Sequence, residues 1–309
     1  TRFDTSDYMV NIACEVKGFD PKNYMHNRDA RRRDLFQQYA IAAAQEAIQH
    51  AGIEVKEANA GRGGVILSSA IGGLKAFQDA AFTLEKSGPR KISPFAIPML
   101  MSNGAAGLIG IEHGFQGPAF SVASACASGA DGIGMAWMML KAGMIDVAIA
   151  GASETPIEVV GVGSFDRLGA MSRRADDPHT PQPFDKNRDG LVMGEGAAVL
   201  ILERESHARE RGAAIIAELA GYGSTADANH ITAPSEDGAG GAKAMQAAVQ
   251  SAGVNPDQVG YINAHGTATP LNDVAETRAI KTAFGDLAYN IPISSTKSMT
   301  GHMMGATGA

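Results

Sequence analysis

Residues 119–144 read AFSVASACASGADGIGMAWMMLKAGM, and this stretch decides the fold class. Residues 119–125 are apolar or small and predict a strand. Residues 128–144 predict a helix that is apolar nearly all round and therefore buried. Cys126 stands at the junction, among alanine, serine and glycine. Because strands that turn into buried helices are typical of layered α/β domains, we expect an α/β fold with Cys126 at a strand–helix turn.

The alternation of strands and helices continues on both sides of this stretch. The apolar patterns predict strands over 62–70, 146–154, 194–203 and 259–269, helices over 35–52, 204–212 and 240–253, and a surface loop over 174–190. Two of the predicted helices end at glycines, at positions 52 and 253, where glycine commonly terminates a helix.

A short motif occurs twice in the chain. AIQHAGI (47–53) and AVQSAGV (248–254) align without a gap, and a short loop and an apolar strand follow each copy. This repeat indicates an internal duplication of a helix–strand unit. We therefore expect two similar domains, over residues 1–212 and 213–309.

The composition excludes several classes of function. Hydrophobic residues make up 45% of the 309 residues and charged residues 19%, which is typical of a globular protein with a sizeable core. The net charge of −7 argues against nucleic-acid binding, which needs a surplus of cations. No apolar run reaches the about 18 residues that span a membrane, and no signal peptide is evident. With only two cysteines, we expect a reducing compartment, the cytoplasm.

Cys126 is a candidate nucleophile. A cysteine at the start of a helix faces free backbone N–H groups and the positive end of the helix dipole, which favour the reactive thiolate. Small neighbours let a substrate approach the sulfur, and the backbone N–H of Cys126 is placed to stabilise an oxyanion. A buried structural cysteine remains the alternative. Cys14 has no such surroundings, and we interpret it as structural.

His265 and His302 are candidate partners of the thiol. Each follows an apolar run, and the ends of strands are where α/β sheets place ligand chemistry. Imidazole exchanges protons near neutral pH, although a histidine at a strand end is as often structural. The chain lacks paired cysteines, an H-E-x-x-H motif and a clean dinucleotide fingerprint. We therefore predict no metal and no bound cofactor.

The chain resembles the β-ketoacyl-acyl-carrier-protein synthases, most closely the type II elongating condensing enzymes. The resemblance rests on SACASG (124–129), PFDKNRDGLVMGEGAAVLILE (183–203), NAHGTATPLNDVAE (263–276) and SSTKSMTGH (294–302). It implies a thiolase-like fold of five layers, αβαβα, with two duplicated halves, mixed sheets and a homodimer. Members of the family have an earlier strand and helix and a later Gly-Phe-Gly-Gly segment. We therefore expect a chain truncated at both ends, with an incomplete second half.

The resemblance also implies a role for individual residues. Cys126 matches the acyl-accepting nucleophile, and His265, His302 and Lys297 match the condensing site. The matched supporting and substrate-binding residues are Asp273 and Glu276 beside the first histidine, Thr267 and Thr269 at the pantetheine arm, and Phe165 and Ile71 in the acyl pocket. Arg28, Arg31 and Arg32 form a basic cluster that fits docking of an acidic carrier protein, or simply a solvated face.

The activity that this resemblance implies is a decarboxylating condensation of fatty acid elongation. An acyl-enzyme thioester would react with malonyl-acyl-carrier-protein to give 3-oxoacyl-acyl-carrier-protein. The phosphopantetheine would be carried by the acyl carrier protein, so that the enzyme needs no cofactor of its own. Two alternatives stay open: a ketosynthase of a polyketide pathway, and a non-catalytic truncated homologue that binds the carrier protein or a dimer partner.

Overall fold

The computed structural model describes residues 2–57 and 59–309, which form two compact units. The Cys126 unit comprises Glu15–Gly161, Gly194–Ala217 and Met303–Ala309. The histidine unit comprises the residues up to Cys14, Val162–Met193 and Glu218–His302. The chain passes between the units several times, so they follow a different division from the expected halves 1–212 and 213–309. Those halves stay a prediction about duplication in the sequence.

The Cys126 unit is built on a mixed sheet of four strands in the order β3-β2-β4-β6. These strands are β2 (Gly63–Ser68), β3 (Ala119–Phe120), β4 (Val147–Glu154) and β6 (Gly196–Glu203). β2 runs parallel to β3 and β4, and β6 runs antiparallel to β4. Every residue of β2 and β4 is buried. The strands predicted over 62–70, 146–154 and 194–203 are thereby confirmed.

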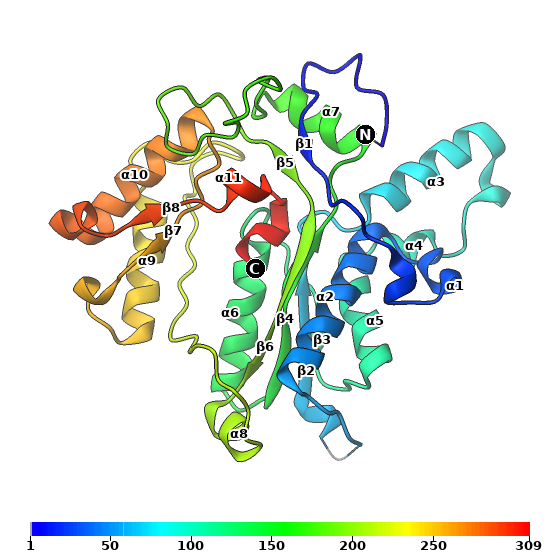
Figure 1. Ribbon diagram of the computed structural model, residues 1–309, viewed down its shortest axis with the longest axis horizontal. Helices are drawn as coiled ribbons and strands as arrows, with labels where there is room; N and C mark the ends of the chain where they lie inside the picture. Colours follow the sequence, from blue (N-terminus) through cyan, green and yellow to red (C-terminus); the bar gives the residue numbers. More distant parts are fainter. Residues whose placement is uncertain (1, 58) are drawn as a thin grey trace. The chain divides into compact units, whose positions relative to one another are not determined.

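Helices cover both faces of this sheet (Figure 1). Side chains alternate between the faces of a strand, so Val65 and Leu67 pack against α2 (Leu35–Ala51) and α5 (Gly104–His113). Ile66, between them, packs against α6 (Ser128–Lys141) on the opposite face. The unit is therefore a three-layered α/β sandwich. Its other helices are α1 (Asn27–Ala30), α3 (Leu74–Ser87), α4 (Ala96–Leu100) and α8 (Glu205–Glu210).

The two copies of the repeated motif have the same local structure. Gly52 and Gly253 both adopt the left-handed conformation just after a helix, at φ values of 62° and 69°. In each copy the backbone N–H of the next residue donates to the carbonyl five residues earlier, from Ile53 to Ile48 and from Val254 to Val249. These contacts form the same glycine-terminated helix end twice. The two copies therefore share the structure of their turn, and the duplication of a helix–strand unit stays a prediction.

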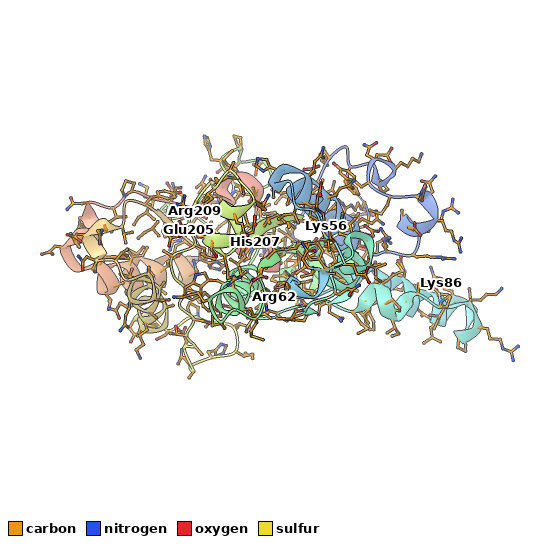
Figure 2. All side chains as sticks on the ribbon, turned by 90° about the horizontal axis from the view of Figure 1, so that it is seen from below. Lys56, Arg62, Lys86, Glu205, His207 and Arg209 are labelled. Carbon is orange, nitrogen blue, oxygen red and sulfur yellow. The ribbon has the colours of Figure 1, made fainter. Side chains whose placement is uncertain are left out.

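Ion pairs hold the end of the sheet where β2 and β4 begin. Arg62 makes two hydrogen bonds to the Asp146 carboxylate, at 2.9 and 2.7 Å, and Arg204 forms a further ion pair with Asp146. His207 lies 2.7 Å from the carboxylate of Glu203. This end of the sheet faces the viewer in Figure 2. It is the opposite end of the strands from Cys126, so its charges serve the sheet rather than the thiol.

The histidine unit contains a short parallel ribbon covered by two helices. β7 (Ile262–Asn263) pairs with β8 (Ile293–Ser294), and α9 (Ala239–Ala252) packs on α10 (Pro270–Phe284). Ile280, Phe284 and Ile291 form its core. α11 (Lys297–Thr300) follows β8. The chain also forms β1 (Ala13–Cys14), which pairs with β5 (Met193–Gly194), and α7 (Val159–Leu168).

Three expectations about these elements need correction. The strand expected over 259–269 is limited to Ile262–Asn263, because among the described residues β7 pairs only with the two-residue β8. The strand expected over 119–125 ends at Phe120, because β3 pairs with β2 only through Ala119 and Phe120. The chain then turns at Ala125, where φ is +52°. The helix over 128–144 is not buried all round: Met135 and Met138 keep 36% and 40% of their surface exposed.

No helix within residues 2–57 and 59–309 combines the length and the apolar character that a membrane span requires.

Candidate active site

Cys126 lies in a tight turn between β3 and α6. The hydroxyl of Ser128 accepts a hydrogen bond from the backbone N–H of Ser124 at 2.9 Å and donates one to the carbonyl of Ala125 at 2.7 Å. These bonds brace the left-handed residue Ala125, directly before Cys126. α6 begins two residues after the thiol, which is partly exposed. The free N–H groups at the start of α6 therefore favour a thiolate at Cys126.

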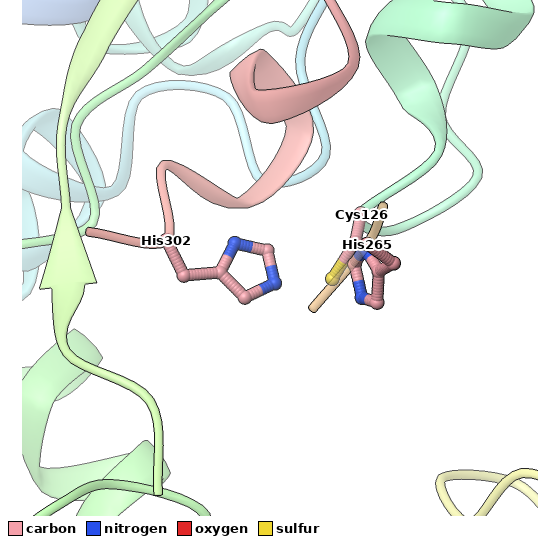
Figure 3. A group of neighbouring side chains, drawn as sticks. All are labelled: Cys126, His265 and His302. Atoms are coloured by element: carbon pink, nitrogen blue, oxygen red, sulfur yellow. The ribbon is translucent and has the colours of Figure 1, made fainter. Parts of the chain in front are cut away.

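His265 and His302 form an edge-to-face pair in the histidine unit. Their ring centroids are 5.4 Å apart and their planes meet at 88° (Figure 3). His265 follows β7, and His302 follows α11. The backbone N–H of His302 donates to the carbonyl of Val192 at 2.7 Å, and the residue is 2% exposed. Two segments far apart in sequence thus present their imidazoles to each other.

The backbone around His265 is held by a carboxylate and a hydroxyl. Glu276, on α10, accepts hydrogen bonds from the backbone N–H groups of His265 at 2.6 Å and Gly266 at 2.7 Å. The hydroxyl of Ser295 donates to the carbonyl of Gly266 at 2.8 Å. Burial raises the pKa of Glu276, although the N–H donors oppose this effect. The ring of His265 is therefore carried by a turn with few degrees of freedom.

Burial and a nearby cation keep both imidazoles neutral. Burial, assisted by the charge of Lys297, lowers the pKa of His265 to about 3. The pKa of His302 is also well below its usual value, because of burial, then His265 and Lys297. Lys297 itself is only 4% exposed. At neutral pH each ring therefore has one N–H donor and one acceptor nitrogen. Such a pair can donate hydrogen bonds to an oxygen that gains negative charge.

The two predicted threonines lie at the N-terminal end of α10. The hydroxyls of Thr267 and Thr269 lie 2.9 Å apart, and Thr269 accepts a hydrogen bond from the backbone N–H of Asn272. Thr269 is thus the N-cap of the helix. Thr267 is buried, at 5% exposure. Their predicted contact with pantetheine stays a prediction.

Asp273 anchors the loop over 174–190. Its carboxylate accepts a hydrogen bond from the backbone N–H of Phe184 at 2.6 Å and lies 3.5 Å from Nε of Arg188. Arg188 also donates to the carbonyls of Thr269 and Pro270, at 3.1 and 2.8 Å. Asp273 therefore supports the turn that carries both threonines.

The remaining predicted residues are distributed as follows. Phe165 lies on α7 and is half-buried, and Ile71 follows β2 and keeps 37% of its surface exposed. Arg28 lies on α1, and Arg31 and Arg32 follow it; all three are exposed. The guanidinium of Arg32 lies over the ring of Phe95, 4.6 Å from its centroid. Burial raises the pKa of the Cys14 thiol, which agrees with a structural role for that residue.

The histidine unit thus joins one connected set of the predicted residues: His265, His302, Lys297, Glu276, Asp273, Thr267 and Thr269. Cys126, Ile71 and the arginine cluster belong to the Cys126 unit. Ser295 and Arg188 hold the backbone of the set, and the motifs do not single them out. Arg188 lies in the motif at 183–203 and Ser295 in the motif at 294–302. This position inside a motif is the signal by which the sequence could have indicated them.

Comparisons with known proteins agree on one family. A sequence model described as "Beta-ketoacyl synthase, N-terminal domain" matches residues 3–208, and one described as "Beta-ketoacyl synthase, C-terminal domain" matches residues 216–309. The chain is 46% identical over 308 residues to 3-oxoacyl-[acyl-carrier-protein] synthase 2 of Staphylococcus aureus, which covers 100% of this chain and 76% of that protein. The Vibrio cholerae protein of the same name is 46% identical over 309 residues, covering 99% and 75%.

Solved structures agree with these matches. A type II PKS acyl-carrier protein in complex with its ketosynthase bound to the hexaketide superposes with a TM-score of 0.90 at 32% identity, covering 99% of this chain and 75% of that one. A β-ketoacyl synthase from Burkholderia phymatum STM815 gives 0.89 at 36% identity, covering 98% and 73%. The chain therefore spans about three quarters of the length of these relatives.

Proposed function

The chain belongs to the β-ketoacyl synthase family, and we propose that it catalyses the decarboxylating condensation that elongates fatty acids. It is an acyltransferase of the 3-oxoacyl-acyl-carrier-protein synthase type, with the thiolase-like fold of ketosynthases. The observation that carries the proposal is the pair of neutral imidazoles, His265 and His302, held edge to face beside buried Lys297. Two neutral imidazoles suit an enolate oxygen, because each keeps one N–H that can donate a hydrogen bond to it.

In the first half of the reaction, Cys126 accepts the acyl group. Its thiolate attacks the carbonyl carbon of an acyl thioester on the carrier protein, and a bond forms between sulfur and carbon. The tetrahedral oxyanion receives a hydrogen bond from the backbone N–H of Cys126. The bond to the pantetheine sulfur then breaks, and the carrier protein leaves as its thiol with the proton that Cys126 gave up. Phe165 and Ile71 line the acyl pocket in this proposal.

In the second half, a malonyl thioester supplies the two new carbons. The bond to its carboxylate breaks, carbon dioxide leaves, and the electron pair forms an enolate. His265 and His302 donate hydrogen bonds to the thioester oxygen as its negative charge develops, which lowers the barrier. The enolate carbon then attacks the acyl carbonyl on Cys126 and expels the sulfur as a thiolate, which takes up a proton from the solvent. The product is a 3-oxoacyl thioester that is longer by two carbons.

Other residues support these steps. Lys297 adds its charge to the burial that keeps the imidazoles neutral, and Glu276 and Asp273 hold the turns that carry His265 and the threonines. We place Thr267 and Thr269 at the pantetheine arm. The pantetheine arrives on the partner, so we propose no cofactor or metal of the enzyme's own. We further propose an acyl carrier protein as partner, docked at Arg28, Arg31 and Arg32, and a cytoplasmic homodimer.

Intact mass spectrometry tests the acyl transfer. The purified protein is mixed with an acyl-carrier-protein thioester, beside Cys126→Ser and Cys14→Ser. We expect a mass gain of one acyl group in the parent protein and in Cys14→Ser, and none in Cys126→Ser. A folded parent protein that gains no mass would contradict the proposal and favour a non-catalytic scaffold.

Addition of malonyl-acyl-carrier-protein tests the condensation. We expect carbon dioxide and a 3-oxoacyl product from the parent protein, and a rate lower by about 100-fold or more in His265→Gln and His302→Gln, since each loses an oxyanion donor. Acylation of Cys126 should persist in both variants. Repeated condensation to polyketide products would instead support the alternative pathway, for which the polyketide ketosynthase among the structural relatives is the specific observation.

A further inference from the structure

Glu154 is a buried carboxylate that accepts hydrogen bonds from four neutral donors, one hydroxyl and three backbone N–H groups. It ends β4 and has no exposed surface. Its Oε1 accepts from the hydroxyl of Ser69 at 2.7 Å and from the backbone N–H of Ile71 at 3.2 Å. Its Oε2 accepts from the backbone N–H groups of Ala70 at 2.7 Å and Gly305 at 3.1 Å. A buried charge is tolerated when hydrogen bonds replace its hydration, and here each oxygen has two donors.

The donors come from two segments of the Cys126 unit that approach closely at Glu154. One is the turn Ser69–Ile71, directly after β2. The other is the single-turn helix η6 (Met304–Gly308). A methyl group at Gly305 would lie 2.6 Å from the backbone nitrogen of Ala70 and 2.6 Å from Oε2 of Glu154. The carboxylate therefore joins the turn to η6, because it accepts hydrogen bonds from both.

The helix η6 in turn packs against the first turn of α6. A methyl group at Gly129 would lie 2.9 Å from the carbonyl oxygen of Gly305 and 2.9 Å from the backbone nitrogen of Ala309. A methyl group at Gly308 would lie 2.8 Å from the backbone nitrogen of Ala130. Gly129 is three residues after Cys126. The backbone of η6 therefore limits where the start of α6, and with it the thiol, can lie.

We propose that Glu154 is a positioning residue for acyl transfer, which fixes the turn carrying Ile71 and, through η6, the helix start that carries Cys126. The inference rests on the proposed function of both residues. In this role Glu154 is ionised, because both oxygens of a carboxylate can accept hydrogen bonds from all four donors at once. Burial raises the pKa of Glu154, and the four donors oppose this effect. Glu154 contacts neither substrate nor thiol in this role.

Glutamine at position 154 separates the two contacts of the carboxylate, one with the backbone N–H of Ile71 and one with η6. The amide keeps one acceptor oxygen and replaces the other by an NH₂ group. The Ser69 hydroxyl can rotate to accept from this NH₂, whereas the N–H groups of Ala70 and Gly305 cannot accept. The amide therefore turns its oxygen toward Ala70 and Gly305, and only the contact with Ile71 is lost. Glu154→Ala loses every contact.

The test compares acylation of Cys126 by acetyl and dodecanoyl carrier-protein thioesters, followed by intact mass. We expect Glu154→Gln to lower the ratio of the dodecanoyl to the acetyl rate by about tenfold, because a displaced Ile71 turn affects only the long chain. Glu154→Ala should slow both rates. Ser69→Ala, which removes one donor to Oε1, should lower the ratio in the same direction. The matched control is Glu158→Gln, a buried carboxylate that receives a hydrogen bond from Gln78 and should keep the parent ratio.

The outcomes separate the two proposals. A parent protein that is not acylated contradicts the proposed function itself. A parent protein that is acylated, with unchanged ratios in Glu154→Gln and Ser69→Ala, overturns the positioning role of Glu154. An equal fall in both rates in Glu154→Gln also overturns it, because a general loss of structure would have that effect. If Glu154→Gln does not fold, the ratio in Ser69→Ala decides.

Discussion

Burial of His265 and His302 in the neutral form lowers the stability of the folded protein at acid pH. The pKa of His265 is about 3 in the folded protein, and a histidine in an unfolded chain titrates near its ordinary value of 6.5. Between these values the unfolded chain binds the extra proton, so stability falls as the pH drops below 6.5. Above pH 6.5 the ring is neutral in both states, and this contribution vanishes. The same sign holds for His302, whose pKa is also lowered.

Replacement of His265 by glutamine should therefore relieve part of the acid destabilisation. We expect the free energy of unfolding of the parent protein, relative to His265→Gln, to fall by about 1 to 2 kcal/mol between pH 7 and pH 5. Urea unfolding at both pH values measures it. His50→Gln is the control, at an exposed side chain in the last turn of α2, and should leave the difference unchanged. Equal pH dependence of the parent protein and His265→Gln would contradict neutral burial of this ring.

The sequence predicts the reactive residues better than the residues that hold them. Cys126, His265 and His302 stand out because thiol and imidazole side chains are rare and lie at predicted strand ends. Glu154 and Ser295 do not stand out. Glu154 ends an apolar strand, where an acidic residue normally marks the surface, and its donor Gly305 lies 151 residues away. Only the folded chain reveals that four donors meet there.

At the scale of elements, the close packing of η6 on α6 gives a direct prediction. Gly129→Ala places a methyl group against backbone atoms of η6, which cannot move as a flexible side chain can. We expect a loss of about 1 to 3 kcal/mol in the free energy of unfolding and slower acylation of Cys126. Gly107→Ala on α5 is the matched control: nothing lies within 4 Å of the added methyl group. That variant should gain up to about 1 kcal/mol, because alanine favours the helix. Equal effects of both substitutions would contradict the packing.

The same scale shows where the apolar pattern is sufficient. β2 and β4 are buried in the centre of their sheet, and their continuous apolar runs predict them well. β3 and β7 have only two residues each, because each pairs with its neighbouring strand over two residues. The apolar pattern of a sequence does not reveal how far such pairing extends. At β3, the hydrogen bond from Ser124 to Ser128 already belongs to the turn. Local side-chain bonds therefore override strand propensity next to the thiol.

At the scale of the whole molecule, the charge distribution bears on the partner. The chain carries a net charge of −7, yet Arg28, Arg31 and Arg32 are exposed together. A local cationic surface on an acidic protein attracts an acidic partner to that surface, and the negative charge elsewhere disfavours docking at other places. Arg32 also packs on Phe95, so its replacement would disturb structure as well as charge. Arg28 and Arg31 are the better positions for a test.

We expect Arg28→Glu with Arg31→Glu to raise the KM for carrier-protein substrates by about tenfold at low salt and to leave kcat unchanged, because the change affects encounter rather than chemistry. The effect should shrink as salt screens the charges. Arg209→Glu is the control, on α8 at the end of the sheet away from Cys126, where Arg209 forms an ion pair with Glu205. A KM that stays the same at low salt, or that rises equally at high salt, would show that the carrier protein docks elsewhere. The arginines would then be a solvated face.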